Sequence, residues 1–163
     1  MSPAEPRAQV LSVIRHADAG DRERFTGDDS LRPLSKKGRK QASMLAKRLG
    51  GSTLDVITSP YLRCVETMSP TSARIRRAMM LASWLVEGES AEEALLQLVE
   101  LTGEIGGLVA CTHQDLMVGM FDVAVAAGAV PSSEPSFEKG ATAEFTIVDG
   151  KVVAVSFVTP PAI

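Results

Sequence analysis

The sequence has 163 residues, which suits one domain of common size and leaves too little chain for two. Apolar residues make up 45% and charged residues 23%, the balance of a globular protein rather than a disordered or fibrous one. The net charge is only −3, yet residues 1–77 hold 15 basic and 8 acidic side chains, while residues 78–138 hold 10 acidic ones and no Lys or Arg. We expect an anionic partner to bind the first half of the chain, unless folding mixes these charges on one surface.

Several classes of protein are disfavoured by composition. Residues 1–10 carry prolines and charges instead of an apolar run, and the longest apolar stretch, 116–130, is interrupted by Asp122 and shorter than the ~20 residues of a membrane span. We therefore expect a cytoplasmic protein with no membrane partner. Aromatic residues are 4% and no nucleic-acid module is visible, so no nucleic-acid partner is expected. Two cysteines and two histidines make a structural zinc site improbable, and we expect no metal and no cofactor.

The first predicted elements are a strand and a helix joined by a charged loop. Gln9–Ile14 is a short apolar run rich in β-branched residues, which predicts a buried strand ending at Arg15 and His16. A polar loop follows over residues 17–34. Ser35 is the predicted N-cap of a helix with apolar residues at helical spacing, a basic opposite face and a pair of glycines at its end.

A second strand and helix are predicted next. Leu54–Thr58 reads as a strand, and Ser59 and Pro60 read as the N-cap and first residue of a helix. This assignment places Arg63 in the first turn of that helix. Residues 79–85 are ambiguous between a strand and a turn.

The second half of the chain predicts two more helices and three strands. Ser90 opens a capping box and a helix, and Leu108–Cys111 is a strand that leads to His113. Residues 116–127 are predicted to be helical. Two apolar segments at 143–158, joined by Asp-Gly, predict a hairpin.

Alternating strands and helices predict a three-layer α/β/α fold with a mostly parallel central sheet, in one domain over residues 1–163. Ligands of such folds bind outside the carboxyl ends of the strands. Arg15 and His16, Arg63, and His113 follow three separate predicted strands, so both histidines of the chain are expected at that edge.

Two arginines and two histidines at one sheet edge would form a cationic pocket with one possible nucleophile. Arg presents a planar fork of N–H donors to phosphate oxygens and stays charged. A neutral imidazole can attack phosphorus and hold the phosphoryl group as phosphohistidine. This chemistry predicts a phosphoryl-transfer site, although each residue taken alone is more often a core or surface residue.

Four sequence blocks resemble the histidine phosphatase superfamily. They are Val-Ile-Arg15-His16-Ala-Asp, Arg32-Pro33-Leu34-Ser35-Lys-Lys-Gly38-Arg-Lys-Gln41-Ala42, Thr58-Ser59-Pro60-Tyr-Leu-Arg63-Cys-Val-Glu-Thr67 and Val109-Ala-Cys-Thr-His113. Because Arg63 and His113 are only 50 positions apart, the chain is most similar to the compact branch typified by SixA phosphohistidine phosphatases, without large insertions. The stretch Gly27-Asp28-Asp29-Ser-Leu-Arg32-Pro33-Leu34 also resembles the phosphatase half of actinobacterial MutT1-like proteins, where it follows a Nudix domain.

The resemblance implies a phosphoglycerate-mutase-like fold and a role for each matching residue. His16 would be the phosphorylated nucleophile, with Arg15, Arg63 and His113 around the phosphate. The residues beside His113 depart from the pattern of the superfamily, in which Gly commonly precedes the second histidine and a small residue and Pro follow it. We expect that departure to change the local loop rather than the chemistry.

No position identifies itself as the acid that protonates a leaving group. Glu87 is the leading candidate because it follows an apolar segment, with Glu89, Asp115 and Asp18 as alternatives; each is otherwise read as a surface carboxylate. If a dedicated acid is missing, substrates with good leaving groups are favoured. An alkoxide must be protonated as it leaves, whereas an imidazole or a phosphate depends much less on an acid. Phosphoramidates and phosphoanhydrides are therefore predicted over sugar phosphates.

The partner is expected to be a phosphorylated protein or a small phosphorylated molecule. Arg22, Arg24 and Arg32, in the loop after His16, are candidates for binding the rest of the substrate. The main prediction is a metal-independent phosphohydrolase acting on phosphohistidine proteins. A nucleotide or dinucleotide polyphosphate phosphatase is the alternative, and a non-catalytic phosphate-binding module is the second one. The oligomeric state, and whether a partner chain such as a Nudix protein works with this one, do not follow from the sequence.

Overall fold

The computed structural model describes residues 7–51 and 54–163. Its strands form one seven-stranded sheet in the order β3-β2-β4-β1-β6-β7-β5. They are β1 (Gln9–Arg15), β2 (Asp55–Thr58), β3 (Met79–Leu81), β4 (Leu108–Thr112), β5 (Val130–Pro131), β6 (Thr142–Val148) and β7 (Lys151–Val158). Strands β1 to β4 are parallel, β6 runs antiparallel to both β1 and β7, and β5 is parallel to β7. The sheet is thus mixed and mostly parallel, as the sequence predicts.

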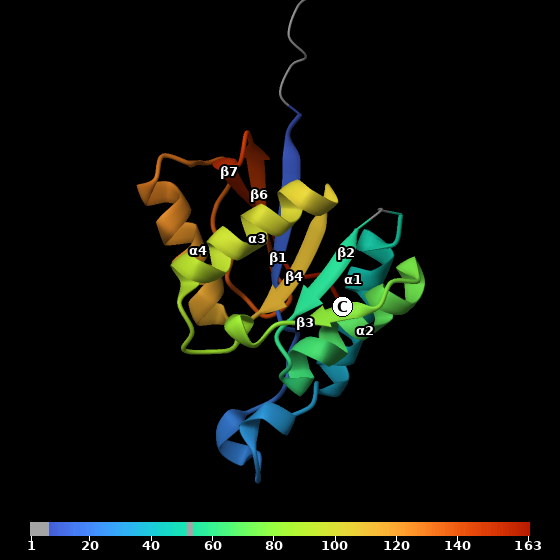
Figure 1. The fold of residues 1–163 in the computed structure, drawn as a ribbon. Coiled ribbons are helices and arrows are strands. Elements are labelled where there is room, and N and C mark those ends of the chain that lie inside the picture. The colour runs from blue at the N-terminus through green and yellow to red at the C-terminus, as the bar shows by residue number, and fades with distance from the viewer. Residues whose placement is uncertain (1–6, 52–53) are drawn as a thin grey trace, which may run out of the picture.

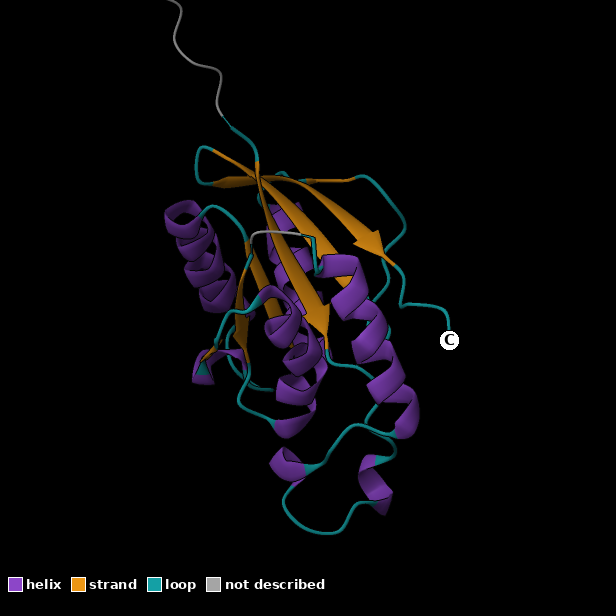
Figure 2. Cartoon of the chain, turned by 90° about the vertical axis from the view of Figure 1, so that its right-hand side faces the viewer, coloured by secondary structure: helices purple, strands orange, loops and turns teal. Residues whose placement is uncertain are grey.

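Four helices cover the two faces of the sheet. They are α1 (Lys36–Leu49), α2 (Leu62–Ile75), α3 (Ala91–Ile105) and α4 (Gln114–Ala126). Helices α1 and α2 lie against one face, and α3 and α4 lie against the other (Figure 1, Figure 2). The predicted three-layer α/β/α architecture is confirmed. No helix in the described residues is long and apolar enough to cross a membrane.

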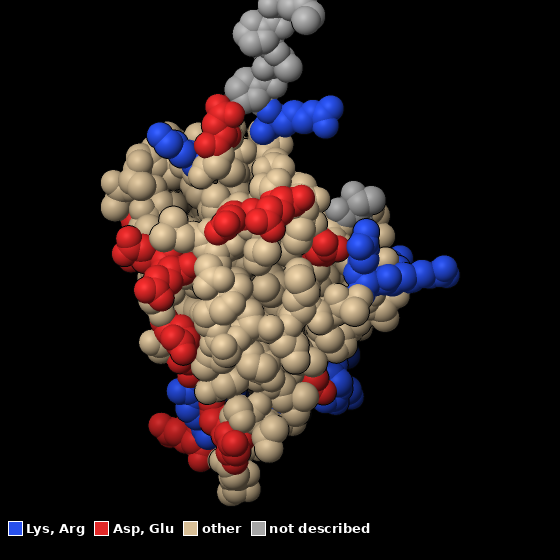
Figure 3. All heavy atoms as spheres, viewed as in Figure 1, with Lys and Arg blue, Asp and Glu red and all other residues tan. Residues whose placement is uncertain are grey.

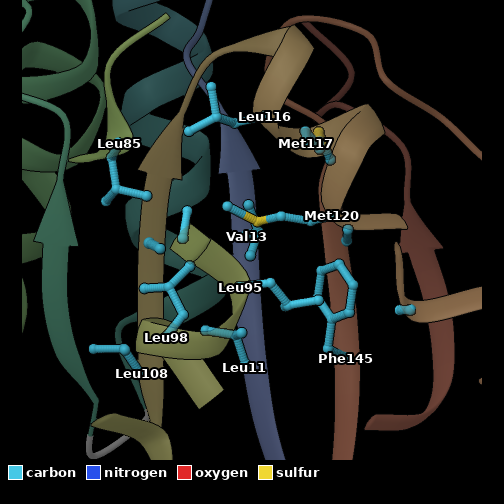
Figure 4. Packing of buried hydrophobic residues seen from close by; sticks show 14 of the residues in the cluster. Leu11, Val13, Leu85, Leu95, Leu98, Leu108, Leu116, Met117, Met120 and Phe145 are labelled. Atoms are coloured by element: carbon cyan, nitrogen blue, oxygen red, sulfur yellow. The ribbon is translucent and has the colours of Figure 1, made fainter. Parts of the chain in front are cut away.

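Both faces of the sheet are buried, which explains why β1 is a continuous apolar run. Leu11 and Val13 pack on the side of α3 and α4 with Met120 and Phe145, as Figure 4 shows. Ile14 points to the other side, into a cluster with residues of α1 and α2. All five side chains are fully buried, and each contributes about 1.5–3 kcal/mol relative to an exposed position. This packing fixes the strand whose end carries Arg15 and His16.

Most predicted elements are found with small shifts at their ends. The Ser35 and Ser90 side chains cap α1 and α3 as predicted, each accepting a backbone N–H three residues on. The hairpin of β6 and β7 turns at Asp149 and Gly150, both with positive φ. The ambiguous segment, 79–85, contains β3 and a 3₁₀ turn, η3 (Ser83–Leu85). The two-residue strand β5 was not predicted, because it is too short to show a period.

Two predicted helix starts are wrong. Helix α2 begins at Leu62, after Tyr61, and not at Pro60. Ser59 does not cap it, because its hydroxyl binds His113. Helix α4 begins at Gln114, two residues earlier than the apolar pattern predicts.

Candidate active site

The carboxyl ends of three strands bring the two histidines and their arginines together. His16 follows β1, His113 follows β4, and Arg63 lies in the first turn of α2 after β2. The His16 backbone N–H donates to the Thr112 carbonyl at 3.1 Å, which ties the two strand ends to each other. The two imidazole ring centroids are 5.5 Å apart with an interplanar angle of 63°. The juxtaposition predicted from the sequence is therefore present.

The His16 ring is buried and has one unprotonated nitrogen available for nucleophilic attack. The residue is 5% exposed, and its Nδ1 lies 2.8 Å from the Ala17 carbonyl oxygen. A carbonyl only accepts, so Nδ1 carries the proton and the lone pair is on Nε2. Burial lowers the pKa of His16 to about 3, helped by the positive charges of Arg63 and Arg15 and opposed by the bond to Ala17. His16 is therefore a neutral imidazole at physiological pH, with Nε2 as the candidate nucleophile.

His113 is held from its other side by Ser59. The ring is 1% exposed, and its Nε2 lies 2.9 Å from the Ser59 hydroxyl oxygen and 3.7 Å from the Cys64 sulfur. Its Nδ1 lies 3.2 Å from a carboxylate oxygen of Glu87, outside hydrogen-bond geometry. The Ser59 hydroxyl also accepts the Tyr61 N–H at 3.3 Å, which leaves its own proton for Nε2. His113 thus presents an Nδ1–H donor toward Glu87.

The two arginines are held by hydrogen bonds from the terminal nitrogens of their guanidinium groups. Arg63 is fully buried and donates to the Asp29 carbonyl at 2.8 Å and to Glu87 at 2.6 Å. Arg15 donates from Nη1 to the Phe137 carbonyl at 2.9 Å. Burial lowers the pKa of Arg15, Glu87 raises it and Arg63 lowers it further. An arginine keeps its charge at neutral pH even so.

Three buried donors of this site lack an acceptor. Among the described residues, four buried side-chain polar atoms have no hydrogen-bond partner, and three of them are Arg15 Nε, Arg63 Nε and His113 Nδ1. Buried polar groups are almost always paired, because an unmade bond costs about 1–3 kcal/mol. The three donors come from three separate segments of the chain. A ligand with several acceptor oxygens, such as a phosphoryl group, is the species that satisfies them together.

Glu87 lies in the middle of the cationic cluster. Its carboxylate accepts from Arg63 at 2.6 Å and from Arg22 at 2.8 Å and 2.9 Å, and it approaches His113. Burial raises the pKa of Glu87, but the Arg63 hydrogen bond and the charges of Arg63 and Arg22 outweigh it, so the pKa is lowered overall. In the free protein Glu87 is a carboxylate that occupies the arginine donors.

The other three candidate acids lie in different surroundings. Asp18 binds the Ser35 hydroxyl and Lys139, and these bonds lower its pKa in spite of burial, so it is ionised and engaged. Asp115 accepts the Gly88 N–H at 2.8 Å, next to Glu87 in sequence. Glu89 is exposed. Of the four, Glu87 alone contacts both Arg63 and His113 in the described structure.

The three loop arginines have three different positions. Arg22 reaches the site through its bonds to Glu87. Arg32 is 5% exposed and donates to Asp29 at 2.9 Å and to the Ala19 carbonyl at 2.7 Å, so its guanidinium organises the loop from within. The side chain of Arg24 is 89% exposed and its ion pair is with Asp21. Arg22 thus joins the cluster through Glu87, Arg32 joins it through Asp29, and Arg24 stays outside it; substrate binding by these residues stays a prediction.

Asp29 is a site residue that the sequence did not indicate. Its carboxylate lies 3.1 Å from Arg63 Nη2 and 2.9 Å from Arg32 Nε. Burial raises its pKa, but the Arg32 hydrogen bond and the charges of Arg63, Arg32 and Arg22 lower it more. Asp29 follows no strand and belongs to no periodic pattern; the one sequence signal that includes it is the resemblance of residues 27–34 to MutT1-like proteins, which assigns it no role.

The second and third sequence blocks hold the loop that follows His16. Gln41 accepts the Asp18 N–H at 2.9 Å, and Thr67 accepts the Ala17 N–H at 2.9 Å. Gly38 allows α1 to touch this loop, since a Cβ at that position would lie 1.9 Å from the Asp18 carbonyl oxygen. These contacts fix the backbone on which the His16 ring is oriented.

Comparison with known proteins points to one family. Residues 11–89 match the model of the histidine phosphatase superfamily (branch 1). The chain is 31% identical over 159 residues to the 8-oxo-(d)GTP phosphatase of Mycolicibacterium smegmatis. The alignment covers 94% of this chain and 49% of the relative. The chain thus spans about half the length of that curated relative.

Solved structures agree in fold. The protein histidine phosphatase SixA complexed with tungstate has a TM-score of 0.70 at 22% identity, with 92% of this chain and 94% of that chain covered. The SixA protein of Nakamurella multipartitia has a TM-score of 0.76 at 21% identity, with 97% and 100% covered. A mycobacterial glucosyl-3-phosphoglycerate phosphatase has a TM-score of 0.65 at 15% identity, with 96% and 100% covered. These likenesses concern the fold.

Proposed function

Because this chain belongs to the histidine phosphatase superfamily, we propose that it is a metal-independent phosphohydrolase that works through a phosphohistidine on His16. The observation that carries the proposal is the group of buried donors without acceptors, from Arg15, Arg63 and His113. They surround a neutral imidazole whose Nε2 is unprotonated. An anion receptor beside a nucleophile is the arrangement that phosphoryl transfer needs.

The reaction has two displacements. In the first, His16 Nε2 attacks phosphorus, a P–N bond to His16 forms, and the bond between phosphorus and the leaving group breaks. In the second, water attacks phosphorus and gives a proton to the Glu87 carboxylate, the new P–O bond forms, the P–N bond breaks with its electron pair returning to His16 Nε2, and inorganic phosphate leaves. Arg15, Arg63 and His113 stabilise the charge on the equatorial oxygens in both steps, and the bond from His16 to Ala17 keeps the ring oriented.

Glu87 is the candidate proton donor, with a restriction set by its surroundings. In the free protein its pKa is lowered and its carboxylate is bound to Arg63. A phosphoryl dianion competes for Arg63 and repels the carboxylate, which raises the proton affinity of Glu87 in the complex. Glu87 is ionised when the substrate arrives and has no proton to give at first. Substrates with good leaving groups are therefore turned over best. Phosphoramidates and phosphoanhydrides meet that condition better than alkyl phosphates.

We propose protein-bound phosphohistidine as the leading substrate. An imidazole takes up a proton near neutral pH without a strong acid beside it. Its departure is therefore compatible with a Glu87 that is ionised in the free protein. The similarity in fold to SixA structures supports the same choice. A nucleotide or dinucleotide polyphosphate is the second candidate, and the similarity to an 8-oxo-(d)GTP phosphatase favours it.

A substrate panel tests the proposal. The wild-type chain and a His16→Ala variant are assayed with a phosphohistidine peptide, nucleoside di- and triphosphates, and an alkyl phosphate. We expect His16-dependent release of phosphate, fastest from the phosphohistidine peptide. Cleavage of nucleotides alone would reverse the order of the two candidates. Phosphate binding without any turnover would leave the non-catalytic module as the better description.

A further inference from the structure

Helix α1 carries cations and no carboxylate; Lys47 and Arg48 in its last turn suit the helix dipole, but those in its first turn do not. Its sequence, KKGRKQASMLAKRL, contains six Lys or Arg residues and no carboxylate. Lys36 and Lys37 lie in the first turn, where the positive end of the helix dipole disfavours cations, and Lys36 and Lys40 are like charges one turn apart. These placements cost stability. Binding therefore explains the cations of the first turn better than folding does.

The exposed cations of α1 form no ion pair with the part of the chain that the structure describes. None of the ion pairs within residues 7–51 and 54–163 includes a residue of α1. Lys36, Lys37 and Lys40 are exposed. Acidic side chains gather over α3 and α4 on the face seen in Figure 3. Helices α3 and α4 contain carboxylates and no Lys or Arg, so they differ in charge from α1 on the other side of the sheet.

Two adjoining hollows connect this basic surface with the active site. The first, of about 620 Å³, is lined by Arg15 of the phosphate site and by Lys37 and Lys139. The second, also about 620 Å³, is lined by Lys36, Arg39, Lys40 and the exposed Met44. Ile163, in the segment after β7, lines both hollows. The carboxylates that line the first are Glu138 and Asp18, and Asp18 is already bound to Lys139.

We propose that the basic surface of α1, with its two hollows, is the docking site for an acidic protein segment that flanks the phosphohistidine of the substrate. The proposal rests on the proposed function. Arg15 and Lys37 line the first hollow, and Lys36 and Lys40 line the second, which shares Ile163 with it. A chain that follows the two hollows away from a phosphoryl group at Arg15 would therefore meet Lys37 and then Lys36 and Lys40. Two hollows exceed what the rest of a mononucleotide fills, and cations without partners attract carboxylates at long range.

The test compares two peptides and a small substrate. Each peptide contains one phosphohistidine, flanked by glutamates in one case and by lysines in the other, and free phosphohistidine is the third substrate. For the wild-type chain we expect kcat/KM to favour the glutamate peptide by at least about tenfold at low salt, with the preference shrinking as salt is added. Lys40→Glu should remove most of the preference. Lys151→Glu, the same change on the exposed start of β7, is the matched control.

Stability separates docking from a structural role. Lys36→Glu replaces a cation with an anion in the first helical turn, so we expect an unchanged or higher Tm together with weaker hydrolysis of the glutamate peptide. Equal kcat/KM for both peptides, or equal loss in Lys40→Glu and Lys151→Glu, would overturn the docking site while free phosphohistidine is still hydrolysed. Failure to hydrolyse free phosphohistidine, with nucleotides cleaved, would instead overturn the proposed substrate.

Discussion

Ser59→Ala isolates the contact that fixes the second histidine of the site. The Ser59 hydroxyl is buried and lies 2.9 Å from His113 Nε2, and the Cys64 sulfur lies 3.7 Å from the same nitrogen. Removing the hydroxyl leaves a buried acceptor unsatisfied, which costs about 1–3 kcal/mol. If that cost shifts the imidazole toward the tautomer with its proton on Nε2, Nδ1 no longer donates to the phosphoryl group.

The expected loss can be stated as a rate. A penalty of 1–3 kcal/mol on the productive tautomer corresponds to a fall in kcat/KM of roughly 5- to 150-fold. The assay is phosphoramidate hydrolysis across pH, with ¹⁵N NMR of the His113 ring to identify the protonated nitrogen. Ser59→Thr keeps a hydroxyl and should restore activity in part.

Thr58→Val is the matched control for Ser59→Ala. It also removes a fully buried hydroxyl, from the neighbouring residue, but Thr58 donates to a backbone carbonyl at 3.1 Å and not to a histidine. We expect it to lower stability and leave the His113 tautomer unchanged. The reasoning is refuted if Ser59→Ala keeps wild-type kcat/KM and the wild-type ring signature, or if Thr58→Val produces the same loss of activity.

Three further predictions concern the loop, the carboxylate and the nucleophile. Gly38→Ala places a Cβ 1.9 Å from the Asp18 carbonyl oxygen, so we expect a loss of about 1–3 kcal/mol in the free energy of urea unfolding, together with lower activity. Glu87→Gln removes the anion that occupies Arg63, so inorganic phosphate should inhibit several-fold more strongly, while turnover of alkyl phosphates falls more than that of phosphoramidates. The pKa of His16 is lowered from 6.5 to about 3, so between these values the unfolded chain binds a proton that the folded chain does not, and stability falls as pH falls. We expect a loss of about 2 kcal/mol from this group between pH 7 and pH 5, measured as the difference between the wild-type chain and His16→Ala.

Each of these predictions has its own control. Gly103→Ala, at a glycine within α3 whose Cβ would meet nothing within 4 Å, should stabilise by up to about 1 kcal/mol, and a destabilisation equal to that of Gly38→Ala would contradict the steric argument. Glu89→Gln, at an exposed residue, should leave phosphate inhibition unchanged. A wild-type chain whose stability does not differ from that of His16→Ala in its pH dependence would show that His16 is not held neutral by burial.

The sequence was sufficient for the main frame of the site because each part of it is encoded locally. A buried parallel strand is a continuous apolar run, and Arg15, His16 and His113 follow such runs directly, so their meeting at one edge follows from the fold class. Helices with a serine cap were placed correctly for the same reason. The cationic pocket was therefore predictable before any contact was known.

Side-chain contacts between distant segments were not predictable in this way. Ser59 is a residue type that commonly caps helices. In the folded chain its hydroxyl binds His113 instead, and α2 begins at Leu62. Arg32 is a substrate-binding candidate because it lies in the loop after His16, but only the folded chain shows that its guanidinium is bound to Asp29. Glu87 could be ranked from its position after an apolar segment, but only the folded chain places it against Arg63.

The central claim is that His16 carries the phosphoryl group during turnover. The most direct measurement is rapid denaturation of the protein during reaction with a labelled phosphodonor, followed by peptide mapping of any acid-labile phosphate. The account predicts one base-stable, acid-labile phosphoryl group on the peptide containing His16 in the wild-type chain and none in His16→Ala. Steady release of phosphate with no adduct, or an adduct on another residue, would contradict it.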